Sequence, residues 1–582
     1  MKKMKIDIIK KYLRPFRKDL IVGGLALLVV NIFSVIIPLE VKDIIDQLQE
    51  GFSLKFIISR SFWLILLATL MGIIRLFSRQ IVFGIGRKVE VNLRQKLFDH
   101  LLIQDPDWIQ KTGSGDIISR ATSDVENIRR LLGFTVLSLC NIILAYTLTI
   151  PSMFSINKTL TISSLMIFPV ILGIVGLFGG RMVNQRRLQQ EALSKLSDLI
   201  QEDLSGISAI KIYAQEQSEF NQFNIFNKTY RNAAINLART ASTLFPLLQG
   251  ISSISLLLIL FIGSSQLQNG FITIGGLVAL ILYVERLVFP TALLGFTINT
   301  FQLGQVSLDR IEEIFKSKPK IKNKKNGWVP DKEFKGSIVA KDLKIKYEGS
   351  KVNTLDGLNL TISPGDLIAI VGPVGCGKTT LAKALGRTID IPNNQLFIDD
   401  IDIKDIDLKY LRKNIAIVPQ EAFLFTSTIS ENLKFGEPQA SFNLVKNSAN
   451  KAGLTEDINN FPMGFDTVVG ERGITLSGGQ RQRTALGRAL LINSPIIVMD
   501  DALASVDNKT ASLIIKEIRE NKNKTIIMIS HQLSVAATCD RVLVMDKGVI
   551  IQEGIHKNLV KQEGLYKKLW ERELAVSNLG KN

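Results

Sequence analysis

The stretch Gly372-Pro-Val-Gly-Cys-Gly-Lys-Thr379 decides the fold of the C-terminal part of this chain. It follows Leu367-Ile-Ala-Ile-Val371, which has the composition of a buried strand, and it precedes residues 380–385, which have the composition of a helix. A glycine-rich turn in this context presents free backbone N–H groups that close around phosphate oxygens. Lys378 is expected to reach the β- and γ-phosphates, and the Thr379 hydroxyl to hold Mg²⁺. The residues predicted to bind the nucleotide here are Gly372, Gly375, Gly377, Lys378, Thr379 and Thr380.

A second apolar run ends in a carboxylate, at Pro495-Ile-Ile-Val-Met-Asp500. A nucleotide site places the acid that holds Mg²⁺ at the end of such a strand. A carboxylate after an apolar run is more often a cap or loop residue, but the glycine-rich loop makes Asp500 a candidate metal ligand. Residues 415–418 and 525–529 also have strand composition, and helical segments separate these runs. The alternation predicts an α/β domain with a largely parallel sheet.

The composition indicates a membrane protein of at least two domains. The chain has 582 residues, of which 46% are hydrophobic, and its mean hydropathy is +0.22, too apolar for a soluble protein unless the excess lies in membrane spans. Cys140, Cys376 and Cys539 lack the spacing of a zinc site or a disulfide framework, which fits a reducing compartment. The net charge of +18 is compatible with a nucleic-acid partner, but basic loops beside membrane spans explain it better.

Six apolar runs are each long enough to cross the bilayer as a helix, which takes about 20 residues. They are residues 20–41, 62–84, 131–154, 160–180, 243–265 and 272–296. The first run lacks a signal-peptide cleavage site and is read as a retained helix. Basic residues cluster before it and in the two long connections, 87–130 and 181–239, which are predicted to extend the spans as helices. By the positive-inside rule, both termini are expected on the cytoplasmic side.

A lysine-rich, turn-rich stretch separates the two halves of the chain. We therefore expect a membrane domain of six helices at residues 1–315, a linker at 316–335, a nucleotide-binding domain at 336–572 and a tail at 573–582.

The pentapeptide Leu476-Ser-Gly-Gly-Gln480 lies between the phosphate loop and the Asp500 strand. In this position it resembles the signature of the ATP-binding cassette (ABC) family, and the resemblance covers nearly the whole chain. A Ser-Gly-Gly turn that opens a helix is a second anion site, because its N–H groups and the positive helix end face outward. The resemblance implies ATP and Mg²⁺ as ligands, bound in part by Ser477, Gly478, Gly479 and Gln480.

Other positions take their roles from the resemblance alone. Tyr347 matches the aromatic residue that stacks on adenine, although an aromatic at a strand end would also explain it. Gln420 matches the glutamine that senses Mg²⁺, so the implied metal ligands are Thr379, Gln420 and Asp500. His531 matches the histidine that contacts the γ-phosphate. The segment that contains Asp507 resembles the loop at which two cassettes meet.

Further segments resemble parts of exporters within this family. Val469-Gly-Glu-Arg-Gly473 is similar to the segment that exporters carry just before the signature. Residues 113–120 and 206–211 resemble the two cytoplasmic loops whose coupling helices touch the cassettes. The resemblance places these coupling helices near residues 105–110 and 213–220, and it favours export over import.

The chain departs from the family at Asp501, where most active cassettes have the glutamate that polarises the attacking water. Aspartate is shorter by one C–C bond, about 1.5 Å. A misplacement of about 1 Å in a catalytic group lowers a rate roughly 100-fold, so slow hydrolysis is predicted, unless backbone adjustment restores the reach. In the family, such an aspartate is typical of heterodimeric exporters that pair one reduced site with one competent site.

Four polar side chains lie inside the predicted spans: Arg75, Gln249, Glu285 and Arg286. Such groups are unfavourable in hydrocarbon and are expected to face a cavity or one another. The alternative is that they lie near helix ends or in a wet passage without a substrate role. Pro246 and Pro290 are candidates for helix kinks that a moving gate uses.

Taken together, the chain is predicted to be one half of a dimeric ABC exporter for an amphiphilic or hydrophobic substrate, in the plasma membrane of a bacterium. The catalytic candidates are Asp501, His531 and Gln420. A heterodimer is favoured and a homodimer stays open. The alternative is a regulatory subunit that binds ATP while its partner hydrolyses most of it. A soluble cassette ATPase that acts on nucleic acid is disfavoured by the six spans.

Overall fold

The computed structural model describes residues 2–51, 53–324, 327–329, 334–470, 473, 475–504, 506, 508–519 and 524–579. The chain divides into two compact units. One comprises Met1–Ile103 and Thr112–Ser317, and the other comprises Gln104–Lys111 and Lys318–Asn582. The segment 104–111 belongs to the second unit because the Asp105 carboxylate accepts hydrogen bonds from the backbone N–H groups of Lys320 and Ile321, at 2.6 and 3.2 Å.

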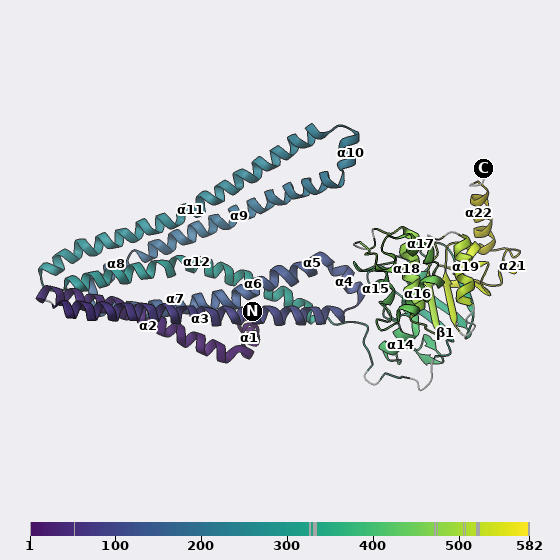
Figure 1. Ribbon diagram of the computed structural model, residues 1–582, viewed down its shortest axis with the longest axis horizontal. Helices are drawn as coiled ribbons and strands as arrows, with labels where there is room; N and C mark the ends of the chain where they lie inside the picture. The colour runs from purple at the N-terminus through teal and green to yellow at the C-terminus, as the bar shows by residue number, and fades with distance from the viewer. Residues whose placement is uncertain are drawn as a thin grey trace. The chain divides into compact units, whose positions relative to one another are not determined.

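The first unit is built of long helices (Figure 1). Within the described ranges, six helical stretches are long and apolar enough to cross a membrane, as the sequence predicts. They are Asp7–Gln49, Leu54–Leu102, Ser114–Ile156, Lys158–Ser205, Glu216–Gln268 and Ile274–Lys316. The helices are α1 (Lys2–Leu13), α2 (Arg17–Glu50), α3 (Leu54–Leu102), α5 (Ser114–Ser119), α6 (Val125–Arg130), α7 (Val136–Ile156), α8 (Lys158–Leu165), α9 (Phe168–Ser205), α10 (Ile207–Ile212), α11 (Glu216–Gln268) and α12 (Ile274–Lys316). Two π-helical turns, Arg120–Asp124 and Leu131–Thr135, lie between α5, α6 and α7.

Side-chain caps begin the helices at the short connections between spans. The Asn157 side chain accepts a hydrogen bond from the N–H of Leu160 at the start of α8. Thr273 does the same for α12, where Asp46 also accepts the N–H of Gly275 at 2.8 Å. These caps satisfy N–H groups that a helix start leaves without partners, so the chain can reverse within a few residues.

The long connections are helical, as predicted. Figure 1 shows α9 and α11 side by side over much of their length and joined through α10. Pro246 and Pro290 lie inside α11 and α12, which continue through them. The short helix α10 covers residues 207–212, and residues 216–220 of the predicted coupling segment form the start of α11.

The second unit contains the predicted parallel sheet. Its strand order is β10-β9-β3-β8-β7-β6, and all neighbours in it are parallel except β9 and β10. The strands are β3 (Leu367–Val371), β6 (Ile415–Val418), β7 (Ile496–Asp500), β8 (Thr525–Ile529), β9 (Arg541–Asp546) and β10 (Val549–Gly554).

A second, four-stranded antiparallel sheet has the order β2-β1-β4-β5 and was not predicted. Its strands are β1 (Ile338–Ile345), β2 (Leu355–Ile362), β4 (Leu396–Ile398) and β5 (Ile401–Asp402). The helices of this unit are α13 (Lys378–Leu385), α14 (Leu408–Asn414), α15 (Ile429–Lys434), α16 (Phe442–Lys451), α17 (Thr455–Asn460), α18 (Gly478–Leu491), α19 (Asn508–Arg519), α20 (Leu533–Ala536), α21 (His556–Leu559) and α22 (Leu565–Leu579), and α4 (Pro106–Thr112) overlaps the segment 104–111.

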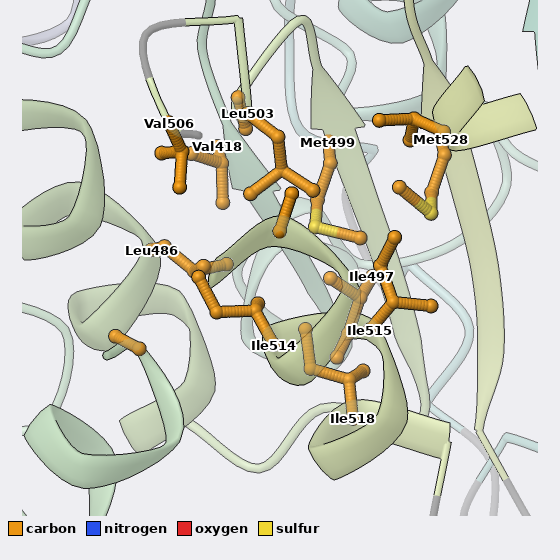
Figure 2. Packing of buried hydrophobic residues seen from close by; sticks show 14 of the residues in the cluster. Val418, Leu486, Ile497, Met499, Leu503, Val506, Ile514, Ile515, Ile518 and Met528 are labelled. Atoms are coloured by element: carbon orange, nitrogen blue, oxygen red, sulfur yellow. The ribbon is translucent and has the colours of Figure 1, made fainter. Parts of the chain in front are cut away.

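One face of the parallel sheet forms a dry core with α18 and α19 (Figure 2). Ile497, Met499 and Met528 contribute from the strands, and Leu486 and Ile514 from the two helices. Each of these side chains is buried. Burial of this apolar surface fixes the strands, and therefore the loops at their carboxyl ends.

Candidate nucleotide-binding site

The glycine-rich loop runs from the end of β3 to the start of α13, and two of its glycines cannot be replaced. Gly372 has φ 154°, and a Cβ on it would lie 2.0 Å from the carbonyl oxygen of Met545. Gly377 has φ 106°, and a Cβ there would lie 2.8 Å from the carbonyl oxygen of Thr354. The loop therefore keeps its shape only with glycine at both positions. Gly375 also has a positive φ, of 83°.

Lys378 opens α13 with its side chain turned back into the loop. Its ammonium group donates hydrogen bonds to the carbonyl oxygens of Gly372 and Pro373, at 2.8 and 2.9 Å. The residue is 6% exposed. A cation is thus held by two carbonyl oxygens of the loop at a helix N-terminus, an arrangement suited to a polyphosphate.

The register of the parallel sheet brings Asp500 to this loop. Ile529 on β8 pairs with Ile370 of β3 on one side and with Asp500 of β7 on the other. The carboxyl ends of β3 and β7 therefore lie at about the same level of the sheet. Asp500 is 4% exposed and accepts a hydrogen bond from the Thr379 side chain. Burial raises the pKa of Asp500, and the charge of Asp501 adds to the effect. A buried carboxylate beside a hydroxyl is a suitable pair of ligands for a hard divalent cation.

Asp501 is held by its backbone next to His531. Its N–H donates to the carbonyl oxygen of Ile529 at 2.8 Å, and its carboxylate accepts the N–H of His531 at 3.4 Å. The φ of Asp501 is 52°, in the left-handed region that aspartate adopts more readily than most residues. The backbone conformation therefore favours aspartate at this position, although the chemistry of the site calls for a longer side chain.

Tyr347 lies beside the same loop. Its hydroxyl is 3.3 Å from the hydroxyl of Thr380 on α13, and the two groups share a hydrogen bond. The ring is partly buried against the core around the antiparallel sheet. The predicted adenine-stacking residue is thus connected to a predicted phosphate-binding residue.

Gln420 is connected to the signature helix through a residue to which the sequence analysis assigned no role. The side-chain amide of Gln482 on α18 donates to the carbonyl oxygen of Gln420 at 3.0 Å. Gln482 is buried, so this bond fixes the loop after β6 to α18. The sequence does not reveal this role, because a buried glutamine in the Arg481-Gln482-Arg483 run has the same pattern as an exposed one.

The signature residues form the N-terminus of α18. The Ser477 side chain accepts the N–H of Gln480 at 3.2 Å, and the Gln480 side chain accepts the N–H of Ser477 at 2.8 Å, which makes a capping box. Asp457 on α17 accepts from Gln480 and Arg483, at 2.9 and 2.6 Å. Ser477 and Gly478 are exposed. No local sequence pattern marks Asp457, because its role depends on a contact with residues more than 20 positions away.

The predicted residues therefore fall into two groups. The residues of the first group are connected by hydrogen bonds or are neighbours in the chain. They are Tyr347, Gly372, Gly375, Gly377, Lys378, Thr379, Thr380, Asp500, Asp501 and His531. Ser477, Gly478, Gly479 and Gln480 form the second group on α18, to which the backbone of Gln420 is tied. Asp507 lies outside the described residues, as do parts of the 469–473 segment.

Two family models match the chain. Residues 20–291 match the ABC transporter transmembrane region, and residues 355–504 match the ABC transporter model. The chain is 31% identical to the probable multidrug resistance ABC transporter ATP-binding/permease protein YheI of Bacillus subtilis (strain 168), over 94% of each chain. It is 35% identical to the multidrug resistance-like ATP-binding protein MdlA of Buchnera aphidicola subsp. Baizongia pistaciae (strain Bp), over 86% of each chain.

A solved structure shows the same fold. It is that of a bacterial Atm1-family ABC exporter with ATP bound, with a TM-score of 0.78 and 23% identity. The match covers 96% of this chain and 98% of that chain.

The raised pKa of Asp500 predicts how the Asp500→Asn variant behaves. In the unfolded chain the carboxyl has its ordinary pKa of about 3.9, so as pH rises the unfolded state loses this proton before the folded state does. Ionisation of Asp500 therefore lowers the free energy of unfolding of the metal-free protein. This loss of stability disappears below the pKa that Asp500 has in the unfolded chain. We expect Asp500→Asn to melt at a higher temperature than the parent at about pH 7 in EDTA, with the difference shrinking toward about pH 4.

Excess Mg²⁺ with ATP should reverse the order at neutral pH, because the variant lacks the carboxylate ligand. Thermal melts of the detergent-purified chain measure both effects. Asp540→Asn, at an exposed position, serves as the control for loss of one carboxylate. An unchanged melting temperature in EDTA, or an equal response of both proteins to Mg²⁺ with ATP, would contradict the assignment of Asp500.

Proposed function

Because the chain belongs to the ABC transporter family, as an exporter with fused membrane and ATP-binding domains, we propose a specific arrangement for its dimer. Each ATP is clamped between the Lys378 loop of one half and the Ser477-Gly478-Gly479 turn of the other. Family membership itself makes the chain a multi-pass membrane protein that couples ATP hydrolysis to export as half of a dimeric transporter.

The exposed start of α18 is the observation that carries this proposal. The capping box uses the N–H groups of Ser477 and Gln480. The N–H groups of Gly478 and Gly479 are therefore the ones in the first turn that can bind phosphate, at the positive end of the helix dipole. Because Asp457 and Gln482 hold α18 firmly, this anion site is pre-organised for a nucleotide that another chain carries.

The ligand of the Lys378 loop is ATP with Mg²⁺. Lys378 contacts the β- and γ-phosphates, Tyr347 stacks on adenine, and His531 approaches the γ-phosphate. Thr379 and Asp500, with Gln420, would hold Mg²⁺, which would neutralise phosphate charge when bound. The hydrogen bond between Thr379 and Asp500, and the burial of the carboxylate, support this set of ligands.

Asp501 favours a heterodimer in which this chain's own site hydrolyses slowly. The left-handed backbone and the contact with His531 hold the carboxylate in place, so backbone adjustment gives it little additional reach. The intact signature, in contrast, can complete a competent site on the partner's ATP. The same observation supports the second candidate, a regulatory subunit that binds ATP while its partner performs most of the turnover. A homodimer of two slow sites is the remaining arrangement.

The substrate proposed is amphiphilic or hydrophobic, and the membrane is the bacterial plasma membrane, in keeping with the bacterial relatives. The basic cluster before α2 supports cytoplasmic termini. We assign coupling to α4 and to the turn between α10 and α11. Tyr213 in that turn and Phe220 at the start of α11 are 73% and 58% exposed, as expected of side chains that dock on a cassette.

Replacing Asp501 with glutamate tests the slow site. If reach limits the reaction, Asp501→Glu raises ATP turnover by the purified chain by up to roughly 100-fold. Asp501→Asn, which keeps the length and the tolerance of left-handed backbone, should abolish turnover at this site. Melting temperatures of both variants report the backbone effect separately. A rate that is unchanged in a well-folded Asp501→Glu protein would refute the argument from side-chain length.

Cysteine accessibility tests the clamp. In a Cys140→Ser background, which leaves only the buried Cys376 and Cys539, the Ser477→Cys variant should react with a maleimide without nucleotide. ATP with Mg²⁺, under conditions that block hydrolysis, should slow this reaction at least roughly tenfold because the opposing triphosphate covers the turn. Leu444→Cys, exposed on α16, is the matched control and should react equally in both states. Equal reactivity of the Ser477→Cys variant with and without bound ATP would sink the proposed clamp.

A further inference from the structure

The structure separates the charged groups that the sequence places inside the spans. Arg286 turns to α2, where its guanidinium donates to the side-chain oxygen and to the carbonyl oxygen of Asn31, at 3.0 and 3.3 Å. Asn31 in turn donates to Asn141 on α7 at 3.1 Å. Glu285, the preceding residue on α12, points elsewhere because successive side chains on a helix are about 100° apart.

Glu285 and Gln249 line the same cavity, between α11 and α12, with a volume of about 410 Å³. The lining residues of α11 recur every three or four positions, as do those of α12, so each helix contributes one face. The polar members are Gln249, Ser252, Ser253 and Glu285. Leu256 and Phe289 are among the apolar members that make up the rest of the wall. This volume is within the range of about 300–1,000 Å³ that is typical of sites for drug-sized ligands.

The charge of the cavity is set by Glu285. A carboxylate in a membrane span is unfavourable unless it has a partner. Over the ranges that the structure describes, Glu285 makes no ion pair, and the neighbouring cation, Arg286, is directed to Asn31. The negative charge therefore faces a cavity whose other polar groups are uncharged amide and hydroxyl groups.

We propose that this cavity binds the transported substrate, and that the substrate is an amphiphilic organic cation. Glu285 pairs with the cationic centre, and Phe289 offers an aromatic face to the same charge. Leu256 and its apolar neighbours take up the hydrophobic body, while Gln249 and Ser252 offer hydrogen bonds to polar substituents. An anion of the same size is repelled by Glu285, and a neutral one leaves that carboxylate unpaired. The inference rests on the proposed export function and narrows its substrate class.

Two ions of matched shape and opposite charge test the proposal. Tetraphenylphosphonium and tetraphenylborate each carry four phenyl groups around one charged atom. Equilibrium binding of each ion is measured on the detergent-purified full chain. We expect the wild type to prefer the phosphonium ion, and Glu285→Gln to bind it at least roughly tenfold more weakly, which corresponds to about 1.4 kcal/mol. Glu285→Asp should keep most of the affinity, and Phe289→Ala should weaken binding of both ions.

Glu191→Gln is the matched control, because it removes an exposed carboxylate from α9 by the same chemical change. It should bind both ions as the wild type does. Equal affinity of the wild type and Glu285→Gln for the phosphonium ion would overturn the proposal. Tighter binding of tetraphenylborate by the wild type would also overturn it.

The outcome is separable from that of the export proposal. Protection of the Ser477→Cys variant by ATP reports the cassette clamp without any substrate. If that protection is present while phosphonium binding does not depend on Glu285, only the substrate assignment fails. If the protection is absent in a chain that binds ATP, the clamp itself fails, whatever the cavity binds.

Discussion

The alignment of β3, β8 and β7 is the constraint on which the nucleotide site depends. Ile529 pairs with Ile370 and with Asp500, so the Lys378 loop and the carboxylate end at one edge of the sheet. The side chains of these strands are buried on both faces. A shift of register by one residue would turn each of these side chains to the opposite face of the sheet and would separate the lysine from the acid. Hydrophobic burial thus positions groups that are themselves polar.

The two proposed anion sites of the second unit are built differently. The Lys378 loop holds a cation on the carbonyl oxygens of Gly372 and Pro373 and needs glycine because neighbouring backbone approaches so closely. The start of α18 uses helix geometry, a capping box and the anchor at Asp457, and the Arg481 guanidinium donates to the carbonyl oxygens of Gly473 and Leu476 just before it. Because the two sites are built from separate residues, the start of α18 can serve a partner's nucleotide, as proposed, whatever rate of hydrolysis Asp501 supports in this chain's own site.

In the first unit, polar groups within the spans are treated in two ways. One is a chain of hydrogen bonds from Arg286 through Asn31 to Asn141, which joins α12, α2 and α7. These side chains serve as hydrogen-bond partners for one another. Glu285 and Gln249 are left to line a cavity. Since hydrocarbon offers no hydrogen bonds, the first arrangement stabilises helix packing, and the second leaves binding capacity for a ligand.

The sequence by itself determined the features that depend on near neighbours: six apolar helices, the glycine-rich loop between strand and helix, the parallel strands and the signature at a helix start. Their signals lie in local period, composition and turn chemistry. Tertiary structure alone decided the antiparallel sheet and the hydrogen bonds of Gln482 and Asp457. It also decided that Arg286 bonds to Asn31 while Glu285 lines a cavity. These depend on residues far apart in the chain that meet only when the core closes, and a local pattern has no information about such meetings.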